Sequence, residues 1–307
     1  MNIRIKSRGC LQAIICILFI SGEAGFSNDP SSGLTVTHRA RSLQPGEVVL
    51  VTLESAKPLR NASGYLLGRE FPFYTSPGSR VWRGLVGIDL EARPGNQFLE
   101  MRGSRSDGSE FRVTHNLRIL SKAFPTRRLT VDEQFVTPPK EVEERIHRES
   151  QRMDEIFKTT TSVKMWRGPF AAPVPGPASS SFGRRSILNG KPRSPHTGTD
   201  FSADTGTVIQ APNAGRAVLV ADLYFSGNTV IIDHGQGLYS LFAHLSKFSV
   251  HEGEEIKIRQ TIGRVGATGR VTGPHLHWAV RLVGTHVDPQ SLMEVLNPPP
   301  RTKGKYD

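Results

Sequence analysis

The sequence predicts a mainly β protein with two β domains joined by a segment that contains one helix. Three observations predict this fold class. Short runs of β-branched and aromatic residues recur along the chain, and turn-forming residues separate them, with 30 Gly and 21 Pro among 307 residues. Apolar residues recur with the spacing of a helix in a single charged stretch. The length is enough for about two domains.

The first predicted domain spans residues 28–121. Its clearest strands are residues 47–54, 81–90 and 111–119, and Pro94-Gly95 and Asp107-Gly108 mark turns between such runs. Short strands with this punctuation are typical of an immunoglobulin-like β-sandwich. His115 interrupts an alternating strand, so we expect it at the surface or at the edge of a pocket.

Residues 122–180 are predicted to connect the domains. Thr137 and Pro138 open a charged stretch whose apolar residues keep one face of a helix, and the amphipathic helix is predicted over residues 141–158. Four prolines between residues 169 and 177 then predict an extended segment. The second domain is expected over residues 181–296, and a disordered tail over residues 297–307.

The second domain is expected to be an antiparallel β structure with short connections. It shows no long helical pattern, and glycines separate its apolar runs. The predicted strands are residues 207–211, 216–221, 229–233, 238–245, 256–258, 261–265 and 276–282.

Residues 1–24 have the pattern of a secretory signal. Basic residues precede a short apolar run, and small residues follow it, with cleavage expected near Ala24. An uncleaved anchor is the alternative, although the run is short for a span of about 20 residues. We therefore expect an exported protein of the periplasm or cell envelope, or a secreted one.

The positions of the cysteines and the net charge limit the metal ligands and the partners that we expect. Cys10 and Cys16 both lie in the signal, so the mature chain has no thiol for a disulfide or a metal. The formal charge of +11 favours anionic partners such as envelope polymers. An export signal and the lack of a nucleic-acid motif argue against a nucleic-acid binder. A role of the charge in solubility alone is the other interpretation.

Histidines and one aspartate form the pattern that points to chemistry. His275 and His277 alternate on a predicted strand, so both side chains share one face. His196 and Asp200 lie four residues apart, where Pro195 and Gly198 disfavour a helix, so a bent loop or strand end has to bring them together. Two histidines and one carboxylate, with a fourth position for water, form a zinc set suited to catalysis.

His244 lies on a second predicted strand. Strict alternation places it on the same face as Leu238, Ser240 and Phe242. If this strand runs beside residues 276–282, His244 and His275 flank the water at the metal, where imidazoles can take up a proton and stabilise an oxyanion. His234, His251 and His286 are expected to be turn or surface residues.

Three separated motifs, HTGTDFSA (residues 196–203), LFAHLS (241–246) and GPHLHW (273–278), resemble those of the lysostaphin/LytM-like, M23-type zinc metallopeptidases, which are peptidoglycan endopeptidases. The resemblance covers about residues 180–293. It implies the antiparallel, duplicated-hybrid-motif fold of that family for the second domain. The chain departs from the family at Ala279, where Glu is common.

The resemblance also implies the roles of the site residues. It assigns His196, Asp200 and His277 as the zinc ligands and His244 and His275 as the catalytic histidines. Asn228, Arg184 and Arg185 are weaker candidates for substrate binding. Asn228 would shape the groove, with a packing or turn role as the alternative, and the arginines would meet substrate carboxylates bidentately, with a solvated surface role as the alternative.

The expected function is therefore an exported zinc metalloendopeptidase that cleaves peptide cross-links of peptidoglycan with a zinc-activated water. We expect it to act as a monomer. Two alternatives remain at this point: a non-catalytic module that binds cell wall or activates a hydrolase, and an exported peptidase that acts on other peptides.

Overall fold

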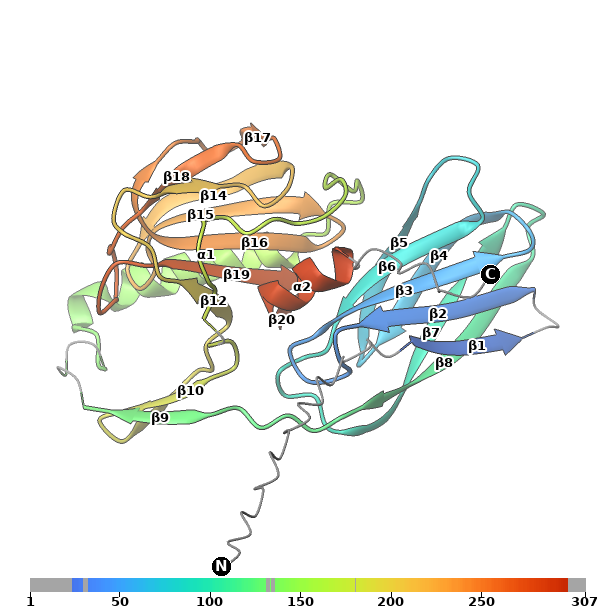
Figure 1. Cartoon of the computed structure of the whole chain (residues 1–307), viewed down its shortest axis with the longest axis horizontal. Coiled ribbons are helices and arrows are strands. Elements are labelled where there is room, and N and C mark those ends of the chain that lie inside the picture. Colours follow the sequence, from blue (N-terminus) through green and yellow to red (C-terminus); the bar gives the residue numbers. More distant parts are fainter. Residues whose placement is uncertain (1–23, 30–32, 131–132, 134–135, 180, 298–307) are drawn as a thin grey trace, which may run out of the picture.

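A computed structural model describes residues 24–29, 33–130, 133, 136–179 and 181–297 (Figure 1). Residues 1–23 of the predicted signal and all but the first residue of the predicted tail lie outside the described residues. Within the described ranges, no helix is both long and apolar enough to cross a bilayer. The chain is mainly β, as predicted, with strands in both halves and a helix between them.

The N-terminal half is an eight-stranded antiparallel sheet in the order β1-β2-β3-β6-β5-β4-β7-β8. The sheet folds over on itself like a barrel, so that β4, β7 and β8 lie behind β2, β3 and β6 (Figure 1). Its strands are β1 (Ala24–Asp29), β2 (Leu34–Ala40), β3 (Val48–Ser55), β4 (Leu59–Leu66), β5 (Arg69–Thr75), β6 (Val81–Gly87), β7 (Gly95–Arg105) and β8 (Glu110–Ile119).

Alternation along the strands builds the core of this sheet. In β8, every second side chain from Phe111 to Ile119 is buried, and the others are exposed. The inward residues of the other strands, such as Val36, Leu53 and Leu99, complete one apolar cluster with them.

The connecting segment supplies a small sheet and a helix. β9 (Thr126–Leu129) joins β10 (Arg185–Leu188) and β11 (Lys191–Arg193) in the order β11-β10-β9. A short 3₁₀ helix (Lys140–Val142) then leads into α1 (Glu143–Lys158). The predicted apolar face of α1 packs as expected, because Met153, Ile156 and Phe157 contact the cluster around Leu219, Ile231 and Tyr239.

The C-terminal half is a nine-stranded sheet whose main path runs β12-β19-β16-β15-β14-β17. Off this path, β18 pairs with β16, β13 with β18, and β20 with β19. α2 (Pro289–Leu296) follows the last strand. The strands are β12 (Gly198–Phe201), β13 (Val208–Gln210), β14 (Gly215–Leu223), β15 (Gly227–Gly235), β16 (Leu238–Phe248), β17 (Glu255–Ile256), β18 (Thr261–Val265), β19 (Leu276–Leu282) and β20 (Thr285–Val287).

The two faces of this sheet have different environments. Phe242 and Trp278 stack within the apolar core on one face, with ring centroids 6.4 Å apart. Tyr239, Leu241 and Ala243 alternate with the core residues of β16 and line a cleft on the opposite face. The candidate site lies on this second face.

Contacts also join the two halves of the chain. Arg41 bridges Glu47 and Asp288, with nitrogen–oxygen distances of 2.8 and 2.6 Å. Asp288 also caps α2, since its side chain accepts from the Gln290 N–H. The backbone N–H of Val48 donates to the Ser291 hydroxyl at 2.9 Å. The exact domain boundaries stay a prediction.

Two histidines differ from their predicted surroundings. His115 is 3% exposed and hydrogen-bonds His38 of β2 at 2.7 Å between ring nitrogens. His234 is fully buried in β15, where Nδ1 donates to the Ala214 carbonyl and Nε2 accepts from the Ser240 hydroxyl. The surface prediction was wrong for both, because each histidine occupies an inward position of its strand and pairs with polar groups within the core.

The buried His38–His115 pair should make the N-terminal sheet sensitive to acid. Burial and the neighbouring His115 lower the pKa of His38 from 6.5 to about 4, so the folded pair stays neutral. The unfolded chain binds protons more readily, so stability is present above about pH 6.5 and is lost as the pH falls toward 4. At about 1.4 kcal/mol per pKa unit, His38 alone accounts for a loss of about 3 kcal/mol in the free energy of unfolding as the pH falls to 4.

We expect the double variant His38→Leu/His115→Leu to lose this part of the acid sensitivity, measured as the free energy of unfolding at pH 7 and pH 4. His251→Leu is the control, because the side chain of His251 is 81% exposed. An unchanged pH dependence in the double variant would contradict the assignment.

Candidate metal centre

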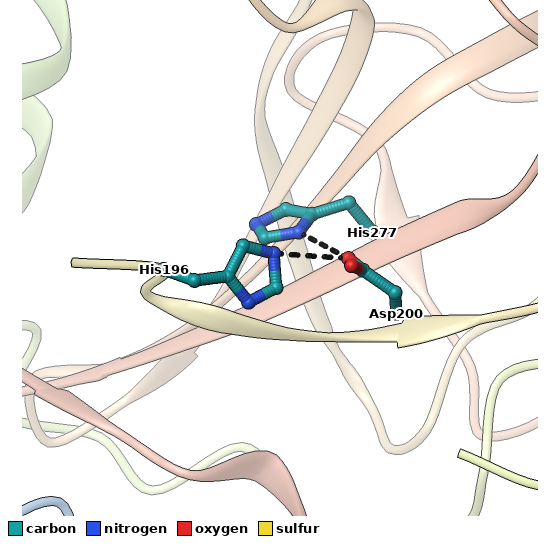
Figure 2. Close-up of side chains that lie close together, drawn as sticks. All are labelled: His196, Asp200 and His277. Carbon is teal, nitrogen blue, oxygen red and sulfur yellow. Dashed lines mark hydrogen bonds and ion pairs between the residues drawn. The ribbon is translucent and has the colours of Figure 1, made fainter. Parts of the chain in front are cut away.

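His196, Asp200 and His277 come together at the junction of β12 and β19. The antiparallel register places Asp200 directly opposite His277. His196 lies two residues before β12, and its ring turns back toward the same carboxylate (Figure 2). The bent segment at Pro195–Gly198 therefore achieves the convergence that the four-residue spacing required.

The three side chains point one donor atom each at a common position. His277 Nδ1 lies 2.9 Å from Asp200 Oδ1, and His196 Nε2 lies 3.1 Å from the same oxygen (Figure 2). One potential ligand atom from each residue lies within 4.8 Å of the others. Tetrahedral zinc with ligand distances of about 2.0–2.2 Å separates its ligand atoms by roughly 3.3 Å, so this donor set fits zinc.

Neighbouring backbone and hydroxyl groups hold these donors in place. His196 Nδ1 donates to the Ser181 carbonyl at 3.1 Å, so Nε2 is the ring nitrogen that faces Asp200 and the candidate metal position. The Ser181 hydroxyl donates to Asp200 Oδ2 at 3.4 Å, and the Ser179 N–H donates to the Asp200 carbonyl. Ser181 lies within the region of family resemblance, about residues 180–293, but none of the three quoted motifs includes it, so this role was missed.

Glycine at position 198 is required by close packing. A Cβ atom there would lie 2.7 Å from His277 Cε1 and 2.6 Å from the Trp278 carbonyl oxygen. Any larger residue would displace the His277 ring or separate β12 from β19.

The electrostatics keep Asp200 charged and His277 neutral. Burial alone would raise the pKa of Asp200, but hydrogen bonds from His196 and His277 outweigh it and hold the pKa well below its usual range. Burial lowers the pKa of His277, although the contact with Asp200 opposes this. Ionised carboxylate and neutral imidazole are the forms that bind a metal.

His244 and His275 lie beside the three donors. The ring centroids of His244 and His275 are 4.9 Å apart, and His275 Nε2 lies 4.0 Å from Asp200 Oδ1. His244 Nδ1 donates to the Thr268 carbonyl and His275 Nδ1 donates to the Gly273 carbonyl, both at 2.9 Å. In the neutral rings, Nε2 is therefore free to accept a proton.

The predicted face of His244 was wrong, although the predicted pairing of its strand with residues 276–282 is confirmed. His244 has φ = 67°, and the strand register is irregular around it. This left-handed residue breaks the alternation, so His244 lines the cleft while Phe242 remains in the core. Burial lowers the pKa of His244 to about 4, against the opposing hydrogen bond to Thr268.

A cleft of about 930 Å³ contains all five of these residues. Ala279 and Leu241 continue its floor away from the metal-binding side chains, and Met153 and Phe157 of α1 bound it farther along. Ala279 occupies the position at which Glu is common in the family that this chain resembles. The side chain at this point of the cleft floor is therefore uncharged.

The weaker substrate-binding candidates divide between the cleft and its surroundings. Arg184 lines the cleft. Arg185 faces Glu91, with 3.5 Å between charged atoms, and the Asn228 amide donates to the Leu245 carbonyl at 3.0 Å. Asn228 also donates its N–H to the Thr268 hydroxyl, so its contacts support the loop that holds His244.

The C-terminal half matches the family model described as Peptidase family M23 over residues 194–289. Two curated relatives also match part of the chain. The peptidoglycan DD-endopeptidase ShyA of Vibrio cholerae is 39% identical over 111 residues, which cover 36% of this chain and 26% of that protein. The DD-carboxypeptidase/endopeptidase Mpg of Neisseria meningitidis is 43% identical over 97 residues, which cover 32% of this chain and 22% of that protein. The chain thus spans about a quarter of the length of these relatives.

A solved structure is similar over most of the chain. It is a crystal structure from Pseudomonas aeruginosa described as a peptidase M23, 32% identical, with a TM-score of 0.65. The match covers 82% of this chain and 96% of that one, so it includes strands of both halves. From this match and from the family model, the chain belongs to peptidase family M23.

Proposed function

We propose that this chain is an exported zinc metalloendopeptidase that hydrolyses peptide cross-links of peptidoglycan. The observation that carries the proposal is the convergence of His196, Asp200 and His277 at the base of a cleft, with His244 and His275 beside them. All five are the residues on which the family resemblance places ligands and catalytic groups.

His196 Nε2, Asp200 Oδ1 and His277 Nδ1 would hold the metal. When bound there, zinc supplies a Lewis acid and lowers the pKa of a coordinated water. Three protein ligands leave a position open, which is typical of catalytic rather than structural zinc sites. Ser181 would act on the metal indirectly, since it fixes the tautomer of His196 and contacts Asp200.

His244 and His275 would handle the proton and the developing negative charge. Each ring is oriented by a carbonyl that accepts from Nδ1, so Nε2 of one ring can take a proton from the attacking water. The lowered pKa of His244 keeps that ring neutral at physiological pH, as a base must be. Once protonated, the same nitrogen can donate to the carbonyl oxygen or to the leaving amine.

Two features support peptidoglycan as the substrate. The named relatives are a peptidoglycan DD-endopeptidase and a DD-carboxypeptidase/endopeptidase. The chain is strongly basic and begins with the pattern of an export signal, which suits work on an anionic polymer in the cell envelope. A non-catalytic module would have no need of both catalytic imidazoles together with the complete ligand set.

The metal assignment predicts which histidine variant loses zinc. His196→Ala removes one of three ligands and should weaken zinc affinity by at least about 100-fold, beyond the 10–100-fold typical of outer-shell changes. His251→Ala is the matched control, since His251 is exposed and pairs with Glu254. Competition with a zinc-chelating dye measures both, and equal affinities would contradict the assignment.

The proton-transfer assignment predicts a different phenotype for His275→Ala. This variant should bind zinc with nearly the affinity of the unchanged chain, but its kcat should fall by about 10²–10⁴-fold. Activity on purified sacculi together with zinc content measures both effects. Unchanged turnover would remove His275 from the mechanism.

The substrate assignment is tested by comparing two polymers. Incubation with purified sacculi should release peptides with new amino termini at cross-links, detected by mass spectrometry, while a folded protein substrate stays intact. Cleavage of the protein with intact sacculi would favour a peptidase that acts on other peptides.

A further inference from the structure

One wall of the cleft is formed outside the main sheet. The small sheet β11-β10-β9 places Arg127 opposite Ser186, and Ser186 opposite Arg193, so three side chains form a row across it. All three line the cleft. Arg127 belongs to the connecting segment and lies outside residues 194–289, the range that matches the family model.

Strand alternation decides which basic residues reach the cleft. Arg127 and Leu129 line it, whereas Arg128 between them does not. Arg184 and Ser186 likewise line it, whereas Arg185 points away toward Glu91. In each of the two basic stretches, alternate residues therefore face the cleft. This selective orientation indicates that the wall is a specific basic surface and not one part of a uniformly basic surface.

Arg184 is fixed next to the metal-binding side chains. Gly183 donates its N–H to the His196 carbonyl at 2.7 Å, and His196 donates its N–H to the Arg184 carbonyl at 2.9 Å. This pair of backbone bonds joins the arginine to the residue that carries one of the proposed ligands. Arg127 is oriented in turn by a hydrogen bond from its Nε to the Ser186 hydroxyl at 3.1 Å.

The guanidinium groups of Arg127 and Arg184 lie near each other on the wall of the cleft. Among the residues that the structure describes, neither Arg127 nor Arg184 forms an ion pair with a carboxylate, and Arg184 Nε is buried without a hydrogen-bond partner. Burial and the positive charge of Arg184 lower the pKa of Arg127, although the Asp200 carboxylate opposes this. Two adjacent cations facing one cleft suit an anionic ligand.

We infer that Arg127 and Arg184 form a carboxylate-binding subsite beside the cleaved bond. The inference rests on the proposed function and narrows its substrate class. The planar fork of arginine matches a carboxylate bidentately, so a substrate with a free carboxylate at this point gains two charge-assisted contacts.

The structure of the cleaved amide bond decides which of the two joined residues carries the free carboxylate. Where the acyl residue is joined through its α-carboxyl group, that group is the scissile carbonyl itself, so a free α-carboxylate at the bond belongs to the residue that contributes the amine. Within a linear protein, that carboxyl group is part of the next peptide bond. In a cross-link to the side-chain amine of a diamino dicarboxylic acid, the second carboxylate, on the carbon that carries this amine, stays free. The subsite thus selects such cross-links over linear chains.

The experiment compares two cross-linked peptide dimers that differ in one group. The carboxyl group next to the cleaved bond is free in one dimer and is a carboxamide in the other. The full chain should cleave the free acid with a kcat/KM about tenfold or more above that of the carboxamide, the size expected for lost hydrogen bonds to a charged group.

Arg127→Gln should lower kcat/KM for the acid dimer by about tenfold and leave the carboxamide dimer nearly unaffected. Arg184→Gln should do the same. Arg128→Gln and Arg185→Gln are the matched controls, because each is the neighbour that points away from the cleft. Calorimetric binding of the amine-side product to the full chain gives a second readout, and Arg127→Gln should weaken it by a similar factor.

Each outcome has a distinct meaning. Equal cleavage of both dimers by the unchanged chain would overturn the subsite and leave the proposed function standing. Equal fractional losses on both dimers in Arg127→Gln would also overturn it, since they indicate a structural role. Cleavage of neither dimer would overturn the proposed function and the subsite with it.

Discussion

The site depends on the antiparallel register between β12 and β19. This register sets Asp200 opposite His277 and Gly198 opposite Ala279, so that the carboxylate, the imidazole and the space for His196 lie on one face. A slip by one residue would turn His277 into the core and bring Trp278 into the cleft. The packing of Trp278 against Phe242 and Phe201 in the core therefore also holds the metal-binding residues in place.

The same register couples the site to the N-terminal half. Thr199, between Gly198 and Asp200, donates its hydroxyl to Asp288, and Asp288 accepts from Arg41 of the N-terminal half. Arg41 also pairs with Glu47, which is 2% exposed. A buried carboxylate with a fixed cationic partner is costly to leave unpaired, so the network joins the two halves firmly behind the strand that carries Asp200.

Much of this arrangement was predictable from the sequence, and the exceptions have physical reasons. The shared face of His275 and His277 followed from strand alternation, and β19 has the predicted bounds. His244 was placed on the wrong face, because a left-handed residue in a strand leaves no mark that alternation can detect. The buried His38–His115 pair was missed since its two partners are 77 residues apart and stabilise each other only in the fold.

The walls of the cleft were the least predictable part. Arg127 and Phe157 come from the segment that the sequence marks only as a connection, yet both line the same cleft as the metal-binding residues. Their positions follow from parallel pairing of β9 with β10 and from packing of α1 on the sheet, which are long-range contacts. Local patterns predict such elements but not where they dock.

The most direct test is anomalous X-ray diffraction from crystals of the full chain, measured on both sides of the zinc absorption edge. The account predicts one anomalous peak within about 2.0–2.2 Å of His196 Nε2, Asp200 Oδ1 and His277 Nδ1. A peak bound elsewhere, or zinc-loaded crystals with no peak between these three atoms, would contradict it.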